Sequence, residues 1–439
     1  MIQILFSTAF ALLVAALPAK AEIAIQDVTT PGGIKAWLLE EHSIPFVALE
    51  VMIRGGSAID LPETRGAINL MGALLEEGAG DLDARAFARA RDDLAMSLSF
   101  DVSADALSVS ARFLTENRDE SLALLRSALT EPRFDPDAID RVRAQVLSSL
   151  QSDLKDPQAI ASQAFNALLY PGHPYANASQ GAVETVSELT RDDLIRAHRR
   201  AITREGINVA VVGDITAEQL KPLLDALFAG LPEESPNLPG AADVNLPGGI
   251  KVVDFETPQS VVRFAQPGVP RDDPDFFAAF VLNHILGGGG FESRLMQEVR
   301  EKRGLTYGIY SYLSIPDYAK IWAGGTASAN DKVAETVRVI REEWARLRDT
   351  GVTQQELDDA KTYLTGSYAL RFDGNGPIAN IAVNMQFDDM PIDYIATRND
   401  EINAVTLEDI NRVARQLLDP DRLTFVVVGQ PQGLQGTIE

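Results

Sequence analysis

Thr190 to Gly213 reads TRDDLIRAHRRAITREGINVAVVG, and Thr406 to Gly429 reads TLEDINRVARQLLDPDRLTFVVVG. The two stretches align without gaps at an offset of 216 residues, and seven of the 24 aligned residues are identical. Each opens with a threonine that suits a helix N-cap, continues with acidic residues in the first turn, and closes with a β-rich run. Each stretch therefore predicts a helix, a short loop and a buried strand.

A second pair of segments repeats at nearly the same offset. Glu120 to Leu129 (ESLALLRSAL) aligns with Glu335 to Trp344 (ETVRVIREEW) at an offset of 215, and both read as amphipathic helices. Two matches at nearly one offset predict two similar halves. The Pro- and Gly-rich stretch from Leu231 to Gly249 separates them, so we predict a first half over 22–235, a linker over 236–249 and a second half over 250–439.

Strand-like runs alternate irregularly with long helical patterns in each half. In the first half they are Phe46 to Arg54, Ser97 to Val102, Ala106 to Phe113 and Val209 to Val212. The second and third form a candidate hairpin that turns at residues 103–105. Strands that neighbour one another in sequence predict an α+β fold, in which each half is a mainly antiparallel sheet with helices packed on it.

Composition limits the chemistry of the chain. It has no cysteine and only four histidines, which excludes thiolate metal sites and cysteine nucleophiles. No two histidines are three or four residues apart, so no helix presents two of them to a metal ion. With 39 Lys plus Arg against 63 Asp plus Glu, the formal net charge is −24, which argues against a nucleic-acid partner.

Residues 1–21 read MIQILFSTAFALLVAALPAKA, an apolar run followed by a small-x-small cleavage pattern at Ala19 to Ala21. This pattern predicts a signal peptide and an exported, periplasmic protein with no stable membrane association once the signal is removed. A membrane anchor is the alternative reading, although the apolar run is close to the short limit for a span and ends in Pro18.

The segment from Asn283 to Ser311, NHILGGGGFESRLMQEVREKRGLTYGIYS, resembles the signature of the C-terminal half of the pitrilysin/insulinase family of zinc peptidases, which are inverzincins. Three further stretches share the resemblance, so that it covers essentially the whole chain after residue 21. They are PFVALEVMIRGGSAIDLPETRGAINLMGALLEEGA from Pro45, LLYPGHPYANASQGAVETVSELTRDDL from Leu168 and GVTQQELDDAKTYLTGSYALR from Gly351. The resemblance implies tandem α+β units, as the internal repeat does.

The metal motif of that family is missing from this sequence. The family carries H-x-x-E-H, with two histidine ligands and a glutamate base, just after the position of Gly66. Asn69, Gly72 and Ala73 stand there instead, and SSLQ stands at residues 148–151, where the resemblance places a third ligand. We therefore expect no metal and no other cofactor in this chain.

The second-half motif is intact, with Arg300 and Tyr307 seven residues apart in REKRGLTY. The resemblance implies that the arginine binds a substrate main-chain oxygen and that the tyrosine hydroxyl stabilises the oxyanion at the scissile carbonyl. The residues alone favour the alternative that Arg300 is a solvated helix charge and Tyr307 a core aromatic, since REKR is an ordinary exposed stretch.

A chain with the second motif and without the first resembles the non-catalytic subunit of a two-chain member of the family. The resemblance implies a metal-bearing homologous partner that holds zinc, with peptides as substrates and this chain inactive alone. It also implies that peptide pairs with the alternating strand whose residues are Ser97, Leu98, Ser99, Phe100 and Asp101. An ordinary edge strand is the alternative for that segment, and a homodimeric, non-enzymatic peptide-binding or assembly protein is the alternative for the whole chain.

Overall fold

The computed structural model describes residues 24–233 and 237–438, and the predicted signal peptide lies outside them. Within these residues, no helix combines the length and the hydropathy that crossing a membrane requires. The elements of the first half are β1 (Gln26–Thr29), β2 (Lys35–Glu40), β3 (Phe46–Arg54), α1 (Ala67–Ala73), β4 (Gly78–Ala79), β5 (Leu82–Asp83), α2 (Ala84–Asp93), β6 (Ser97–Val102), β7 (Ala106–Leu114), α3 (Arg118–Thr130), α4 (Pro136–Asp153), α5 (Pro157–Leu169), α6 (Val183–Glu188), α7 (Arg191–Ala201), β8 (Ile207–Gly213) and α8 (Ala217–Leu227).

The second half repeats this plan. Its elements are β9 (Gly249–Asp254), β10 (Gln259–Pro267), α9 (Phe276–Asn283), the π-helical segments η5 (His284–Gly288) and η7 (Met296–Glu301), β11 (Thr306–Ser314), β12 (Ile321–Ala329), α10 (Val333–Thr350), α11 (Gln354–Gly366), α12 (Asn375–Phe387), α13 (Tyr394–Ala404), α14 (Leu407–Leu417) and β13 (Thr424–Gly429).

Each half is built on one main sheet, and the two sheets share a strand order. The first runs β1-β2-β8-β3-β7-β6 and the second runs β11-β12-β10-β13-β9. Read from the opposite edge, the second sheet matches the first without β1, and each contains one parallel pair, β2 with β8 and β9 with β13. All other pairings are antiparallel. The predicted α+β class with two similar halves is confirmed.

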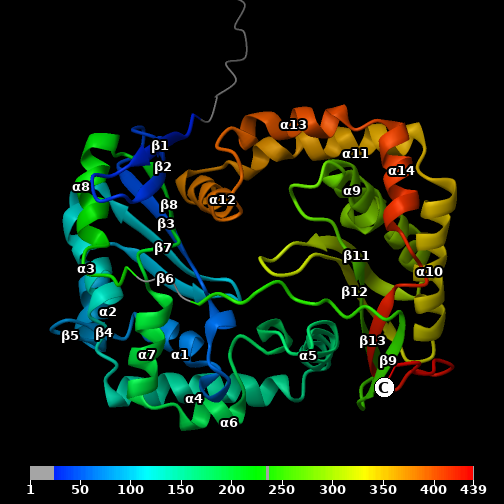
Figure 1. The fold of residues 1–439 in the computed structure, drawn as a ribbon, viewed down its shortest axis with the longest axis horizontal. Helices are drawn as coiled ribbons and strands as arrows, with labels where there is room; N and C mark the ends of the chain where they lie inside the picture. Colours follow the sequence, from blue (N-terminus) through cyan, green and yellow to red (C-terminus); the bar gives the residue numbers. More distant parts are fainter. Residues whose placement is uncertain (1–23, 234–236, 439) are drawn as a thin grey trace, which may run out of the picture.

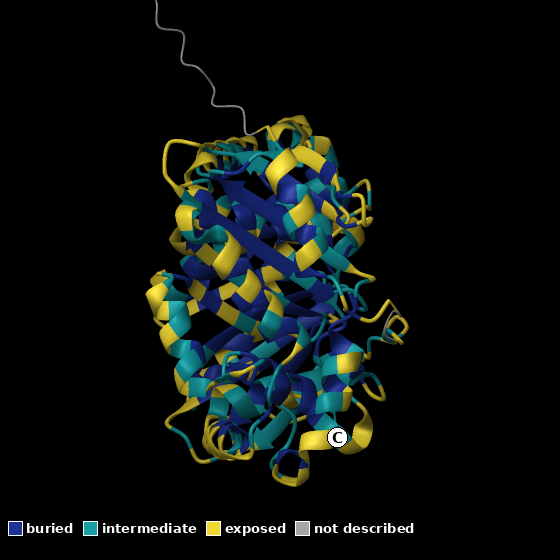
Figure 2. Ribbon diagram, turned by 90° about the vertical axis from the view of Figure 1, so that its left-hand side faces the viewer, coloured by how far each residue is buried: buried dark blue, intermediate teal, exposed yellow. Residues whose placement is uncertain are grey.

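The repeated sequence forms the same local structure twice. In α7 the Thr190 side chain accepts from the Asp193 N–H, and the Asp193 carboxylate accepts from the Thr190 N–H; Thr406 and Asp409 do the same in α14. Each helix is followed by a strand that is paired on both sides, β8 or β13, and most residues of these strands are buried. Figure 2 shows buried strands inside the molecule and exposed residues on the surrounding helices. These reciprocal bonds satisfy backbone donors that the helix leaves unpaired, so the short sequence pattern fixes both helix starts.

The two halves exchange helices. α5 belongs to the first half by sequence but packs on β10 and β13 of the second sheet, where Phe165 joins a buried cluster with Ala265 and Val426. In return, α12 packs on β3 and β8 of the first sheet, and Ala379 and Val383 are buried there. Figure 1 shows α12, in orange, against the first sheet and α5 beside β13. Each sheet is thus covered on one face by its own helices and on the other by a helix of the opposite half.

Polar contacts also join the halves. Arg54 at the end of β3 pairs with Asp317 at 2.5 Å, and its guanidinium lies 4.1 Å from the ring centre of Phe387. The hydroxyl of the buried Tyr175 donates to Asp105 and accepts from the N–H of Tyr318. These bonds fix the β6–β7 turn of the first half against the β11–β12 loop of the second.

The connecting segment is bound to both halves along its described residues. Pro232 accepts a hydrogen bond from the N–H of Arg204 in the first half. The N–H of Ala242 donates to the carbonyl of Tyr318 in the second half, and the N–H of Asn245 donates to that of Leu169 at the end of α5. Although this segment is rich in proline and glycine, specific hydrogen bonds hold it against both halves.

Candidate functional site

The helix α1 carries the three positions at which the resemblance expects metal ligands and base. Asn69 is half-buried, Gly72 is buried and Ala73 is exposed. A Cβ atom on Gly72 would lie 2.7 Å from Cγ2 of Val102 on β6. The absence of a side chain at position 72 therefore allows α1 to pack closely on the edge strand.

The start of α1 is fixed by a carboxylate. Asp60 accepts hydrogen bonds from the N–H groups of Gly66, at 2.8 Å, and Ile68, at 3.1 Å. Burial raises the pKa of Asp60 to about 7, although both hydrogen bonds and the charges of Arg200 and Arg65 favour its ionised form. This carboxyl group therefore titrates close to neutral pH.

Residues 148–151 lie on α4. Across residues 24–233 and 237–438, no three His, Asp or Glu side chains gather in a way that could hold a metal ion. The four histidines instead make separate local contacts: His42 with Asp214, His173 with the carbonyl of Gly240, His198 with the carbonyl of Leu129, and His284 stacked on Tyr363.

Arg300 and Tyr307 lie on consecutive elements of the second half. Arg300 is in η7, where it pairs with Glu301 and lies 4.7 Å above the centre of the Phe291 ring. Tyr307 is on the edge strand β11 and is 87% exposed, and its hydroxyl makes no hydrogen bond to any described residue. The reading of Tyr307 as a core aromatic is wrong, because a bulge between Thr306 and Ile309 interrupts the alternation of β11 at this residue.

A buried carboxylate holds the segment that carries Arg300. Glu298 is 5% exposed and accepts from Lys302, Arg303 and Arg346 at 2.6, 2.6 and 3.0 Å. Burial alone would raise the pKa of Glu298, but these three hydrogen-bonding cations lower it to about 2. Glu298 therefore stays ionised and anchors η7 to α10, leaving Arg300 on the outer side of the turn.

The strand β6 forms the other sheet edge of interest. Among the strands of the described chain it pairs only with β7, and its residues alternate between exposed and covered. Ser97, Ser99 and Asp101 are exposed, whereas Leu98 is buried and Phe100 is half-buried. The edge is open for a further strand, and its polar face points to the side of the sheet on which α12 lies.

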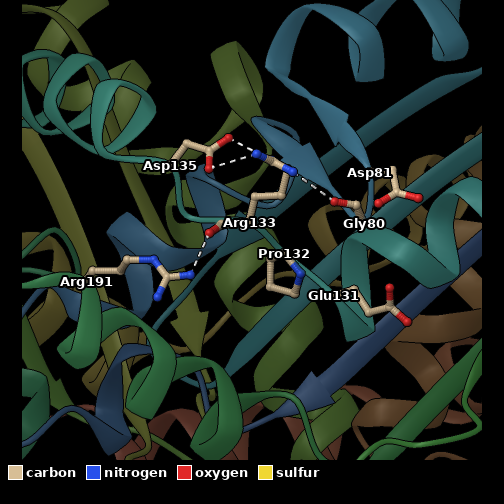
Figure 3. Close-up of a pocket in the computed structure, with 7 residues that line it drawn as sticks. All are labelled: Gly80, Asp81, Glu131, Pro132, Arg133, Asp135 and Arg191. Carbon is tan, nitrogen blue, oxygen red and sulfur yellow. Dashed lines mark hydrogen bonds and ion pairs between the residues drawn. The ribbon is translucent and has the colours of Figure 1, made fainter.

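A surface hollow elsewhere in the first half is lined by residues that pair with one another. Arg133 donates to Asp135 at 2.7 and 3.2 Å and to the carbonyl of Gly80, and Arg191 donates to the carbonyl of Arg133 (Figure 3). Arg191 also donates to the carbonyl of Phe134. These bonds join the β4–β5 hairpin to the start of α7. We assign the hollow a structural role.

Two family descriptions match the chain. Residues 36–182 match the insulinase domain of peptidase family M16, and residues 188–364 match the M16 inactive domain. The chain belongs to peptidase family M16.

The similarity of this M16 chain to known proteins extends over nearly its full length. The non-peptidase homolog YmxG of Helicobacter pylori is 28% identical over 89% of this chain and 90% of its own length. An uncharacterized zinc protease of Streptomyces coelicolor is 26% identical over 90% of this chain and 87% of its own. The crystal structure of a peptidase M16 inactive domain from Pseudomonas fluorescens superimposes with a TM-score of 0.85 at 29% identity, covering 95% of this chain and all of the other. The chain is therefore similar over nearly its full length both to an M16 homologue named as a non-peptidase and to one named as a zinc protease.

Sequence reasoning missed several polar residues of this M16 chain that the fold brings together. Glu50 and Arg112 lie on neighbouring strands of the first sheet, facing the first turn of α12. One signal was available, because Glu50 is the only acid in the apolar run FVALEVMIR. Nothing in the sequence predicted that Glu50 and Arg112 lie close to α12, because this helix begins more than 260 residues after the start of β7.

Proposed function

We propose that this chain is the zinc-less subunit of an exported heterodimeric metallopeptidase and that it supplies Arg300 and Tyr307 to the zinc site of a metal-bearing M16 partner. The observation that carries the proposal is the contrast between the halves. The first half has Asn69, Gly72 and Ala73 in place of the family's ligands and base, and no group of side chains in its described residues could hold a metal ion. The second half presents Tyr307, which is 87% exposed and whose hydroxyl has no partner among the described residues. A scaffold protein has no need of an exposed oxyanion donor.

The proposed chemistry follows from the two side chains. The hydroxyl of Tyr307 would donate a hydrogen bond to the scissile carbonyl oxygen, which gains negative charge during hydrolysis. The zinc of the partner would supply the activated water. The guanidinium of Arg300 is always charged and donates through several N–H groups, so it orients a substrate main-chain carbonyl. Phe291 supports the guanidinium from below. Peptide is held by β6 as an added strand, since this edge offers unpaired backbone groups.

Reconstitution tests the proposal. The chain is mixed with a metal-bearing M16 homologue from the same genome, and cleavage of a fluorogenic peptide is measured for each protein alone and for the mixture. Activity should appear only in the mixture. Tyr307→Phe and Arg300→Ala should each lower kcat about 10²- to 10³-fold.

Matched controls separate the proposed role from a general effect. Tyr363→Phe removes another exposed tyrosine hydroxyl, and Arg338→Ala removes another exposed arginine; both should leave kcat unchanged. Equal activity with and without this chain would contradict the proposal. A stable homodimer that does not copurify with any metal-bearing homologue would instead favour a non-enzymatic peptide-binding shell.

A further inference from the structure

A polar cavity of about 310 Å³ lies where α12 of the second half meets the first sheet. Its floor consists of side chains from β3, β7 and β6, including Glu50, Ser110 and Asp101, and its wall includes Gly376 and Asn380 of α12. Both halves of the chain contribute to it, so the cavity exists only because the helices are exchanged. It lies apart from Arg300 and Tyr307, which are on the second sheet and η7.

One end of the cavity is suited to a carboxylate. Arg112 of β7 lines this end, is exposed to solvent, and makes no hydrogen bond or ion pair within the described parts of the chain. Its guanidinium lies against the first turn of α12, because a Cβ atom on Gly376 would be 2.5 Å from Nη2 of Arg112. A cation beside the positive end of a helix dipole is unfavourable unless an anion lies between them.

The first turn of α12 has further free donors. No side chain caps this helix, whose N-cap is Gly374. Asn375 is 5% exposed, and its Nδ2 lacks a hydrogen-bond partner in the described structure. A buried donor without an acceptor is costly. A bound carboxylate would therefore satisfy both the helix terminus and Arg112.

The other end of the cavity is suited to an ammonium group. Glu50 is 5% exposed and receives one side-chain hydrogen bond, from the hydroxyl of Ser110 at 2.7 Å. Burial raises the pKa of Glu50, while that hydrogen bond and the charge of Arg112 oppose the rise. Asp101 adds a second carboxylate to the lining. A buried carboxylate gains most from a charged donor placed beside it.

The Cα spacing of Arg112 and Glu50 on the sheet indicates the size of the ligand. Ala48 pairs with Arg112 and Glu50 pairs with Ser110, so Arg112 and Glu50 are diagonal neighbours across the strand pair. Diagonal neighbours are about 7–8 Å apart, and an extended dipeptide spans about 7 Å. We infer that this cavity binds a short peptide with free ends, its carboxylate at Arg112 and the α12 terminus and its ammonium at Glu50 and Asp101. Such a peptide is the kind of product that proteolysis releases.

Four probes test the assignment by isothermal titration calorimetry on the isolated full-length chain. Alanyl-alanine carries both charges, N-acetyl-alanyl-alanine lacks the ammonium, alanyl-alanine amide lacks the carboxylate, and alanine is shorter. Alanyl-alanine should bind, and each blocked form should bind about tenfold or more weakly, since a hydrogen-bonded charge is lost. The measurement needs no partner subunit, so its outcome is independent of the proposed heterodimer.

Variants assign each end of the ligand to its residue. Arg112→Gln should weaken alanyl-alanine to the level of its amide, and Glu50→Gln should weaken it to the level of the acetylated form. Gly376→Ala keeps both charges but displaces the guanidinium, so it should weaken binding as Arg112→Gln does. Arg199→Gln removes an exposed arginine of α7 and should change nothing.

Several results would overturn the inference. These are no detectable binding of alanyl-alanine, equal binding of alanyl-alanine and both blocked forms, and an unchanged preference for the free carboxylate in both Arg112→Gln and Gly376→Ala. Alanine binding as tightly as alanyl-alanine would overturn the assignment to a peptide. Circular dichroism melting curves of each variant show that a loss of binding does not come from unfolding.

Discussion

Replacing Phe165 with alanine should destabilise the second half, although Phe165 belongs to the first half by sequence. Its side chain is 7% exposed and lies in the buried cluster under α5, on the sheet formed by β10 and β13. Truncation of a buried phenylalanine typically costs 3–5 kcal/mol, and the partial exposure and the small neighbours Ala161 and Ala265 favour a loss of about 3 kcal/mol. With an m value of about 2 kcal/mol/M, the urea midpoint should fall by about 1.5 M.

Tryptophan fluorescence reports on the correct half of the chain. Trp322 and Trp344 are fully buried in the second half, whereas Trp37 lies beneath α12 in the first. A Trp37→Phe background therefore leaves only second-half reporters. The reasoning is refuted if Phe165→Ala leaves the midpoint of these reporters at the parental value. Leu154→Ala, at a 60% exposed position, is the control and should shift nothing.

Three further predictions concern single side chains. Because the folded-state pKa of Asp60 is raised to about 7, the free energy of unfolding of the parent relative to Asp60→Asn should fall by about 3 kcal/mol as pH rises from 4 to 7. Urea titrations across this pH range measure the difference, and a flat difference would contradict the prediction. Thr406→Ala should lower the free energy of unfolding by about 1 kcal/mol, because α14 loses its N-cap side chain. Thermal unfolding measures this loss, and an unchanged stability would mean that Asp409 alone is sufficient to cap the helix. Gly72→Ala should lower the free energy of unfolding by about 1 kcal/mol, because the added Cβ meets Val102. A double-mutant cycle with Val102→Ala measures the contact: the double variant should lose less stability than the two single variants together, and full additivity would disprove the contact.

The sequence predicted the local parts of the fold well. The strand at Phe46 to Arg54 has the bounds that its pattern indicates, and the hairpin turns at residues 103–105 as expected. Four glycines from Gly287 to Gly290 follow a helix-like stretch of sequence, and this pattern predicts a helix end and a close backbone approach. The approach is confirmed, since a Cβ on Gly287 would lie 2.7 Å from the N atom of Ser311, but the backbone continues as a π-helical turn through Gly288. Periodicity and turn chemistry act over a few residues, so they determine these features.

The long-range parts could not be predicted in the same way. The apolar faces of α5 and α12 look like those of any helix that packs on its own sheet, and no local signal states which sheet each will cover. The cavity at Arg112 and Gly376 depends on that choice, because its two walls are 264 residues apart in sequence. The Pro- and Gly-rich composition of the connecting segment indicated a linker but not the hydrogen bonds that hold it.

The exchange of α5 and α12 determines what happens when the chain is cut. Proteolysis within residues 231–249 yields a first fragment whose sheet has lost α12 and whose helix α5 has its apolar side uncovered. The second fragment has a sheet without α5 and carries α12 with its apolar side uncovered. Each fragment exposes the surface that the other one fits. Expression of either piece alone should therefore give aggregates, whereas coexpression should restore a nicked but complete molecule, so the chain is a natural candidate for a split-protein complementation reporter.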